Sequence, residues 1–196
     1  WAYDEIDLNC GCPSERVQRG AFGACLMAEP KLVAQCVKAM KDAVDLPISV
    51  KHRLGLDSMD ASSSKADYQF ALDFILSVAD AGASQVTIHA RNAVLKGLSP
   101  KENRSKPPLR YAVAAQLRLD AQKQFPNLKV LLNGGLESNE QIAGHWHDFD
   151  GFMVGRAAYH FPAMLLGWDD LIRTNGDAAG YLFSETEWHR IQIALV

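Results

Sequence analysis

The sequence predicts an α/β protein with a parallel sheet, and specifically a (β/α)8 TIM barrel of which five of the eight strands are present. Short apolar strands and helices alternate five times along the 196 residues, as expected for a parallel sheet covered by helices. Each strand is also followed by polar or glycine residues, and barrels assemble their active sites from the carboxyl ends of many strands. An open doubly wound sheet fits the alternation too, but the series of polar strand ends favours the barrel.

The predicted strands are short stretches with at least one buried face. Residues 4–8 alternate polar and apolar side chains, which is typical of a strand buried on one side. The other four are mostly apolar and are bounded by turn residues: residues 47–51, 85–89, 128–133 and 151–154. In a parallel sheet their carboxyl ends would meet on one side of the protein.

Two helices are predicted from apolar residues that recur every three or four positions. Pro30 suits a first helical turn, and the apolar side of the helix after it carries Leu32, Val33, Cys36, Val37 and Met40. A helix over residues 65–81 has an apolar side made of Ala71, Phe74, Ile75 and Val78. Gly82 is its predicted stop.

The remaining connections follow from local signals. Residues 15–26 are predicted as a glycine-bearing loop, and residues 111–124 as a helix. A short helix begins after Ser138, because Ser138 and Gln141 have the spacing of a capping box. The tail from Trp168 is predicted to be an amphipathic helix.

Composition limits the possible functions and locations. The formal net charge of -3 argues against a protein that coats nucleic acid, although a local basic patch can bind RNA on an acidic protein. No apolar run is long enough to span a bilayer, and there is no secretory signal. The four cysteines do not form a dense disulfide framework, which favours the reducing cytoplasm.

Two cysteines follow the first strand, in the stretch Asn9-Cys10-Gly11-Cys12-Pro13-Ser14. Gly11 permits unusual backbone angles and Pro13 disfavours a helical Cys12, so a stiff turn is predicted to carry the Cys12 thiol. The spacing fits neither a structural zinc site nor the CxxC of redox proteins. We interpret Cys10 as a small buried hydrophobe and Cys12 as a candidate catalytic thiol.

Polar or glycine residues stand at all five strand ends: Asn9 and Cys12, Lys51 and Arg53, His89 and Arg91, Asn133-Gly134-Gly135, and Gly155-Arg156. The two glycine-containing ends resemble the phosphate site of barrels, where backbone N–H groups approach an anion and an arginine binds it bidentately. Lys51 could place a cation against a cofactor ring that becomes anionic on reduction. For His89, a place in the core and a role in the site remain equally open.

This set of groups can reduce a carbon–carbon double bond, with a hydride donor on one face of the substrate and a thiol on the other. A thiol with a pKa of roughly 8.5 is mostly protonated at neutral pH and can donate its proton to a developing carbanion. No GxGxxG fingerprint follows any strand, so a Rossmann-bound nicotinamide is disfavoured. Flavin mononucleotide (FMN), with its single phosphate, fits better.

Residues 92–109 form a long connection that is rich in basic residues and contains three prolines. A connection of this length without secondary structure is usually functional or disordered. Its basic side chains favour RNA over a small substrate, because a small substrate needs no phosphate contacts. They are Lys96, Lys101, Arg104 and Lys106.

Six motifs, in order, resemble those of the bacterial tRNA-dihydrouridine synthases, most closely the A-type enzymes that act on the D-loop: Leu8-Asn-Cys-Gly-Cys-Pro-Ser, Val50-Lys-His-Arg, Ile88-His-Ala-Arg, Gly97-Leu-Ser-Pro-Lys-Glu-Asn-Arg, Leu132-Asn-Gly-Gly and Val154-Gly-Arg-Ala-Ala-Tyr. The resemblance runs from about Tyr3 to Leu166. It implies an FMN barrel followed by a small helical tRNA-binding domain. It also implies that NADPH reduces FMN, that hydride then passes to uracil C6, and that a cysteine protonates C5.

By position in these motifs, the resemblance assigns Cys12 as the catalytic acid and Asn9 as a contact of the target uridine. It assigns Lys51 and His89 to the flavin, and Lys101 and Arg104 to the tRNA. The phosphate binders that it implies are Asn133, Gly134, Gly135, Gly155 and Arg156. It further implies no metal, no membrane association and a monomeric complete protein.

The chain also departs from the family pattern. The family's first three strands, with an early flavin-binding loop and a glutamine contact, have no counterpart, and the helical domain is cut off after Val196. The resemblance therefore implies an internal fragment, with a partial barrel over residues 1–172 and the start of the helical domain over residues 173–196. Two other functions stay open: an FMN barrel that reduces a small enone or pyrimidine, and a non-catalytic RNA-binding remnant.

Overall fold

The computed structural model describes residues 3–57 and 64–176, which fall into two compact units. The first unit comprises Trp1–Gly135 with Phe149–Met153, and the second comprises Leu136–Asp148 with Val154–Val196. The strands, all in the first unit, are β1 (Ile6–Cys10), β2 (Ile48–Arg53), β3 (Gln85–His89), β4 (Lys129–Asn133) and β5 (Gly151–Met153). Its helices are α1 (Glu15–Arg19), η1 (Gly23–Ala28), α2 (Pro30–Ala43), α3 (Ser64–Asp80), η3 (Glu102–Arg104) and α4 (Tyr111–Gln124).

The five strands form one parallel sheet in the order β1-β2-β3-β4-β5. Each strand pairs with the next one along the chain, and the order does not reverse anywhere in the described sheet. A doubly wound sheet has such a reversal, where its ligand binds. The consecutive order is instead that of a segment of a (β/α)8 barrel, as predicted from the sequence.

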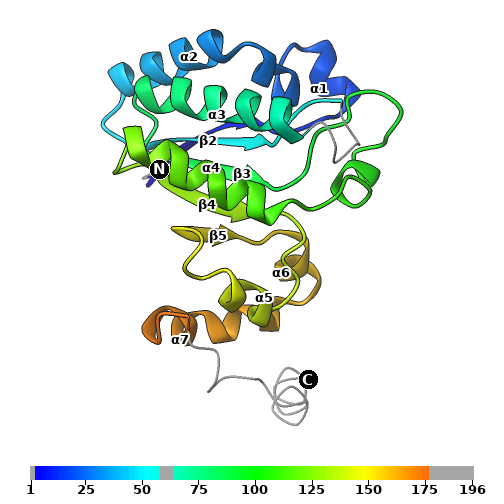
Figure 1. Ribbon diagram of the computed structural model, residues 1–196, viewed down its shortest axis with the longest axis vertical. Coiled ribbons are helices and arrows are strands. Elements are labelled where there is room, and N and C mark those ends of the chain that lie inside the picture. The colour runs from blue at the N-terminus through cyan, green and yellow to red at the C-terminus, as the bar shows by residue number, and fades with distance from the viewer. Residues whose placement is uncertain (1–2, 58–63, 177–196) are drawn as a thin grey trace. The chain divides into compact units, whose positions relative to one another are not determined.

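Helices α2, α3 and α4 cover one face of this sheet (Figure 1). The apolar side predicted for α3 is confirmed, because its four residues are fully buried: Ala71, Phe74, Ile75 and Val78. In α2 the buried side is narrower than predicted, since Val33 and Val37 are buried but Leu32 is 46% exposed. Gly82 follows α3 with a φ of 102°, a left-handed conformation that suits a helix stop.

The two faces of the sheet differ in chemistry. The register aligns Cys10, His52 and Ile88 on the face that packs on the helices, where the His52 ring lies 5.2 Å from that of Phe74 in α3. Side chains alternate between faces along a strand, so their neighbours in sequence point the other way. The face opposite α2, α3 and α4 therefore carries polar rows at its carboxyl end: Asn9, Lys51 and Thr87, then Arg53, His89 and Asn133.

Some predicted boundaries are wrong. Residues 15–26 are not a loop but form α1 and most of η1; the Ser14 hydroxyl accepts a hydrogen bond from the Val17 N–H, which caps the first of them. Strand β1 lies two residues further along than predicted, and β2 continues to Arg53. Both extensions pair in parallel with neighbouring strands, and such pairing through space has no local sequence signal.

The second unit contains α5 (Asn139–Gly144), α6 (Arg156–His160), η4 (Pro162–Gly167) and α7 (Trp168–Arg173). The capping box predicted at Ser138 is confirmed: its hydroxyl accepts from the Gln141 N–H, and the Gln141 side chain accepts from the Ser138 N–H, both at 3.3 Å. A helix does begin at Trp168. The helical domain expected over residues 173–196 lies almost wholly outside the described residues.

None of the helices in the described ranges combines the length and the apolar character needed to cross a bilayer.

Candidate active site

The turn after β1 is fixed by hydrogen bonds on both sides of Gly11. The Asn9 side-chain oxygen accepts a hydrogen bond from the Gly11 N–H at 3.0 Å, and Arg53 Nε donates to the Gly11 carbonyl at 3.1 Å. The two peptide groups that flank Gly11 are therefore each restrained by one side chain. The predicted stiff turn under Cys12 is present, and Asn9 helps to build it.

A second contact holds Cys12 from the other direction. Its carbonyl accepts a hydrogen bond of 2.8 Å from the Ala24 N–H in η1. Gly23, at a φ of 77°, makes this approach possible, since a Cβ there would come within 2.6 Å of the Cys12 oxygen. The Cys12 thiol is partly exposed and donates to the Ser14 hydroxyl at 3.5 Å.

The two cysteines of this motif are in different environments. Cys10 is fully buried on the helix-packed face, and burial raises the pKa of its thiol to about 12. It is therefore protonated and shielded at neutral pH, as its interpretation as a buried hydrophobe requires. Cys12 alone offers an accessible thiol at the carboxyl end of β1.

Lys51 lies beside Asn9 in the register, on the face opposite α2, α3 and α4. Burial, and then repulsion by Arg53, lowers the pKa of its ammonium to about 8, with Asp7 opposing the change. Lys51 forms no ion pair with any residue in the described ranges. A partly desolvated cation of this kind is unfavourable alone and is stabilised by an anionic ligand.

His89 and the glycine turn after β4 lie against each other. His89 is 8% exposed, and a Cβ on Gly134 would come within 2.6 Å of its ring. Gly134 has a φ of 102° and Gly135 a φ of 68°, so both positions require glycine. The Tyr111 hydroxyl also donates to the Gly134 carbonyl at 2.6 Å. The turn is thus held by the Tyr111 bond, and its glycines allow the His89 ring to approach the backbone closely.

The other predicted phosphate binders are divided between the two units. The Asn133 side chain donates to the Met153 carbonyl at 2.6 Å, which ties β4 to β5. Gly155 and Arg156 belong to the second unit, where Arg156 is exposed and begins α6. The phosphate site that joins these groups stays a prediction.

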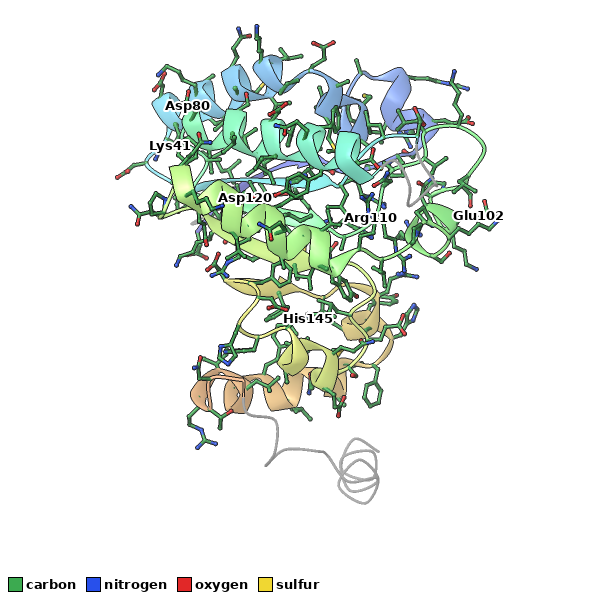
Figure 2. The ribbon with its side chains drawn as sticks, viewed as in Figure 1. Lys41, Asp80, Glu102, Arg110, Asp120 and His145 are labelled. Atoms are coloured by element: carbon green, nitrogen blue, oxygen red, sulfur yellow. The ribbon has the colours of Figure 1, made fainter. Side chains whose placement is uncertain are left out.

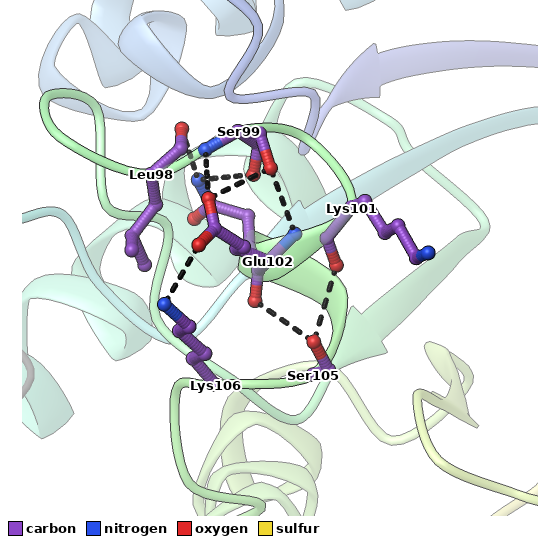
Figure 3. Close-up of polar contacts among 7 residues, drawn as sticks. Leu98, Ser99, Lys101, Glu102, Ser105 and Lys106 are labelled. Atoms are coloured by element: carbon purple, nitrogen blue, oxygen red, sulfur yellow. Dashed lines mark hydrogen bonds and ion pairs between the residues drawn. The ribbon is translucent and has the colours of Figure 1, made fainter.

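The connection over residues 92–109, called the excursion below, is folded around Asn103. Asn103 lies in a polar stretch of the sequence but is fully buried in the structure. Its side chain bonds both the N–H and the carbonyl of Val94 at 2.8 Å. Glu102 accepts from the Ser99 N–H and pairs with Lys106 at 2.7 Å (Figure 3). The excursion is therefore an ordered surface loop, with η3 inside it.

The basic residues of the excursion differ in their surroundings. Lys106 is held by Glu102, whereas the Lys101 side chain extends away from that cluster (Figure 3). Lys101 precedes η3 and Arg104 is its last residue, and both are exposed. These two are the residues predicted to contact tRNA, and they lie on the solvent side of the loop.

Sequence reasoning missed a partly buried cluster that anchors the excursion. Arg110 pairs with Asp67 at 3.1 Å, and the Asn92 side chain donates to the same carboxylate oxygen at 2.8 Å. Figure 2 shows Arg110 at the start of α4, at the end of this helix that is nearer to Glu102 of the excursion. Asp67 lies near the start of α3, far from Arg110 in sequence, so no motif revealed the pair.

The sequence shows Arg53 only as a polar residue at a strand end. It is 3% exposed and bonds backbone carbonyls of both the Cys12 turn and the excursion. In the sequence, the only signal for a role of Arg53 is that it lies two positions after Lys51, at the same strand end.

The chain matches the family model described as dihydrouridine synthase (Dus) over residues 1–182. It is 55% identical over 163 residues to a protein of Pseudomonas syringae pv. tomato named tRNA-dihydrouridine(20/20a) synthase. This match covers 83% of this chain and 46% of that protein. Proteins of the same name from Xanthomonas campestris pv. campestris and Synechocystis sp. are 56% and 54% identical, over 84% and 83% of this chain and 46% of each relative. The chain thus spans about half the length of the curated relatives it matches.

Proposed function

The chain belongs to the dihydrouridine synthase family, and we propose that the protein containing it reduces a uridine in the D-loop of tRNA to dihydrouridine. The relatives' names carry the label 20/20a, so we propose these tRNA positions as the target. The observation that carries the proposal is the Cys12 turn. It presents one accessible thiol at the strand ends, next to the row of Asn9 and Lys51.

FMN is the cofactor that we propose for the strand ends, with NADPH as its reductant. Lys51 supports this choice, because it is a partly buried cation without an ion pair in the described ranges, and an anionic ring or phosphate would stabilise it. The glycine turn at Gly134 supports it as well, since it leaves no side chain between the backbone and His89. When bound, reduced FMN supplies a hydride to C6 of uracil.

The remaining contacts of the cofactor are proposed by position in the family motifs. Lys51 and His89 would contact the flavin ring system. The phosphate would be held by the two glycine-containing strand ends, made of Asn133, Gly134, Gly135, Gly155 and Arg156. Backbone N–H groups and a guanidinium suit an anion of this kind.

Cys12 is the proposed general acid. As the hydride adds to C6, the electron pair of the C5–C6 double bond moves to C5, and the Cys12 thiol donates its proton there. The resulting thiolate regains a proton from solvent, so atoms and charge balance over one turnover. The hydrogen bonds on both sides of Gly11 keep the thiol directed at one place during this step.

Asn9, Lys101 and Arg104 are the proposed tRNA contacts. The Asn9 oxygen is occupied by the Gly11 N–H, which leaves its amide N–H groups as the donors for a uracil carbonyl. Lys101 and Arg104 are exposed on an ordered loop, so they can bind phosphates with little loss of conformational freedom.

Replacement of Cys12 tests this function in the full-length protein. Cys12→Ala and Cys12→Ser should bind FMN as the wild type does and form dihydrouridine far more slowly, because neither an alkyl group nor an alcohol is an adequate acid. Cys36→Ser is the matched control, since Cys36 is exposed on α2 and has no proposed role. Wild-type dihydrouridine formation by Cys12→Ala would remove Cys12 as the acid.

A further inference from the structure

Arg53 is a buried cation whose partners are three backbone carbonyls. It ends β2 and is 3% exposed. Its Nε donates to Gly11 at 3.1 Å, and its Nη1 donates to Asn103 at 3.0 Å and to Asn92 at 3.4 Å. Buried arginines are normally paired with carboxylates, but within the described ranges Arg53 forms no ion pair.

The first of these carbonyls belongs to the Cys12 turn. The Gly11 carbonyl is part of the peptide group that joins Gly11 to Cys12, so the bond from Arg53 fixes the orientation of that peptide plane. The direction of the Cys12 side chain depends on the same plane. Loss of the bond would remove this restraint on the peptide plane and leave those made by the Asn9 side chain and the Ala24 N–H.

The second carbonyl belongs to the core of the excursion. Asn103 is 0% exposed, and its side chain holds the Val94 backbone while its own carbonyl faces Arg53. Asn103 lies between Lys101 and Arg104 in sequence. Any shift of the Asn103 backbone would therefore move the two proposed RNA contacts.

We propose that Arg53 is a positioning residue that holds the Cys12 turn and the RNA-facing excursion in one fixed register. RNA bound by Lys101 and Arg104 then meets the Cys12 thiol at reaction distance. The bridge that Arg53 makes between the Gly11 and Asn103 carbonyls is a feature of the fold. Its catalytic consequence rests on the proposed function.

The chemistry of arginine suits this role. A guanidinium presents five donors in a rigid plane, so one side chain can bond carbonyls from separate segments at fixed angles. Lysine is a compact point charge on a flexible chain and cannot reproduce that geometry. Burial, followed by repulsion from Arg91 and Arg104, lowers the pKa of Arg53 to about 10, so it remains charged at neutral pH while lying close to the excursion's own cations.

Hydrogen exchange measured by mass spectrometry tests the bridge without any assay of activity. The reporters are the Ala24 N–H, bonded to the Cys12 carbonyl, and the Val94 N–H, bonded to the Asn103 side chain. In full-length Arg53→Met and Arg53→Lys, exchange should rise about tenfold or more at both amides together. Leu117→Ala, a fully buried change in α4, is the control for general destabilisation. Equal behaviour of the Arg53 variants and Leu117→Ala at both amides overturns the bridge.

A third variant tests the same bridge from the excursion. Asn103→Ala keeps Arg53 but removes the side chain around which the excursion is folded. Exchange at the Ala24 N–H should rise in this variant, although Ala24 lies far from residue 103 in sequence. An unchanged Ala24 N–H would show that the two segments are independent.

Steady-state kinetics test the catalytic consequence. For Arg53→Lys, kcat for uridine reduction should fall on the order of 10- to 100-fold with a smaller rise in the KM for tRNA, because the thiol and the RNA contacts lose their fixed register while Lys101 and Arg104 themselves are still present. A raised KM with unchanged kcat would instead make Arg53 a residue of RNA binding and overturn the proposal. If wild-type protein reduces no uridine, the proposed function fails, and the exchange data still decide whether the bridge exists.

Discussion

Replacement of Lys51 by methionine should stabilise the cofactor-free protein while weakening flavin binding. Burial is the main cause that lowers the pKa of Lys51 from 10.5 to about 8. This corresponds to about 3 kcal/mol of unfavourable free energy for the charged side chain in the folded state. Methionine has a similar length and no charge, so Lys51→Met removes that unfavourable contribution.

The dependence on pH follows from proton binding in the two states. Between about pH 8 and pH 10.5, unfolded Lys51 keeps its proton and folded Lys51 loses it. The unfolded state then binds more protons, so the free energy of unfolding of the wild type rises with pH across this window. Below about pH 8 both states are charged, and the full burial penalty is present.

The assay is urea unfolding of the cofactor-free full-length protein from pH 7 to pH 10.5. Lys51→Met should be more stable than the wild type by up to about 3 kcal/mol at neutral pH, and the difference should shrink to nearly zero by the top of the range. Lys129→Met is the control, because Lys129 is an exposed residue of β4 in the same sheet. Loss of stability in Lys51→Met at pH 7, or a gain that does not vary with pH, would refute the burial argument.

Three further changes separate stability, cofactor binding and RNA binding. Burial lowers the pKa of His52 to about 4, so wild-type stability should fall as the pH drops from about 6.5 to 4, and His52→Gln should flatten this slope in melting temperatures. Arg156→Ala should weaken FMN binding about tenfold to a hundredfold in fluorescence titrations, if its guanidinium holds the phosphate; unchanged affinity would make Gly155-Arg156 an ordinary turn. Replacing Lys101 and Arg104 with alanine should lower tRNA affinity and reduce its salt dependence by up to about one unit of slope per lost phosphate contact. NADPH oxidation with oxygen as acceptor should not change in that double variant; if both activities fall, the loop is structural.

The parts of the fold that sequence predicted well are those with local causes. The α3 face, the Gly82 stop and the Ser138 capping box each depend on side chains within a few positions of one another, and all three are confirmed. The parallel sheet was also predictable, because alternation of strands and helices leaves few arrangements. The extension of β2 to Arg53 was not, since it depends on pairing with β3.

The residues of the candidate site also differ in whether the sequence could identify them. Cys12 and Lys51 could be identified from the sequence because each lies within two residues of the carboxyl end of a strand. The roles of Arg53 and Asn103 could not, because each depends on contacts with segments distant in the chain, such as the 50-residue separation between these two. Their bonds go to backbone carbonyls, which every residue type offers, so no pattern of residues records them.

Mass spectrometry of tRNA gives the most direct test of the central claim. The full-length protein would be loaded with FMN and incubated with NADPH and an unmodified tRNA transcript, and the RNA would then be digested and its fragments weighed. The account predicts that one D-loop fragment gains the mass of two hydrogen atoms, that Cys12→Ala abolishes the gain, and that free uridine is not reduced at a comparable rate. A flavin-loaded protein that leaves the tRNA mass unchanged, or that reduces free uridine as readily, would contradict it.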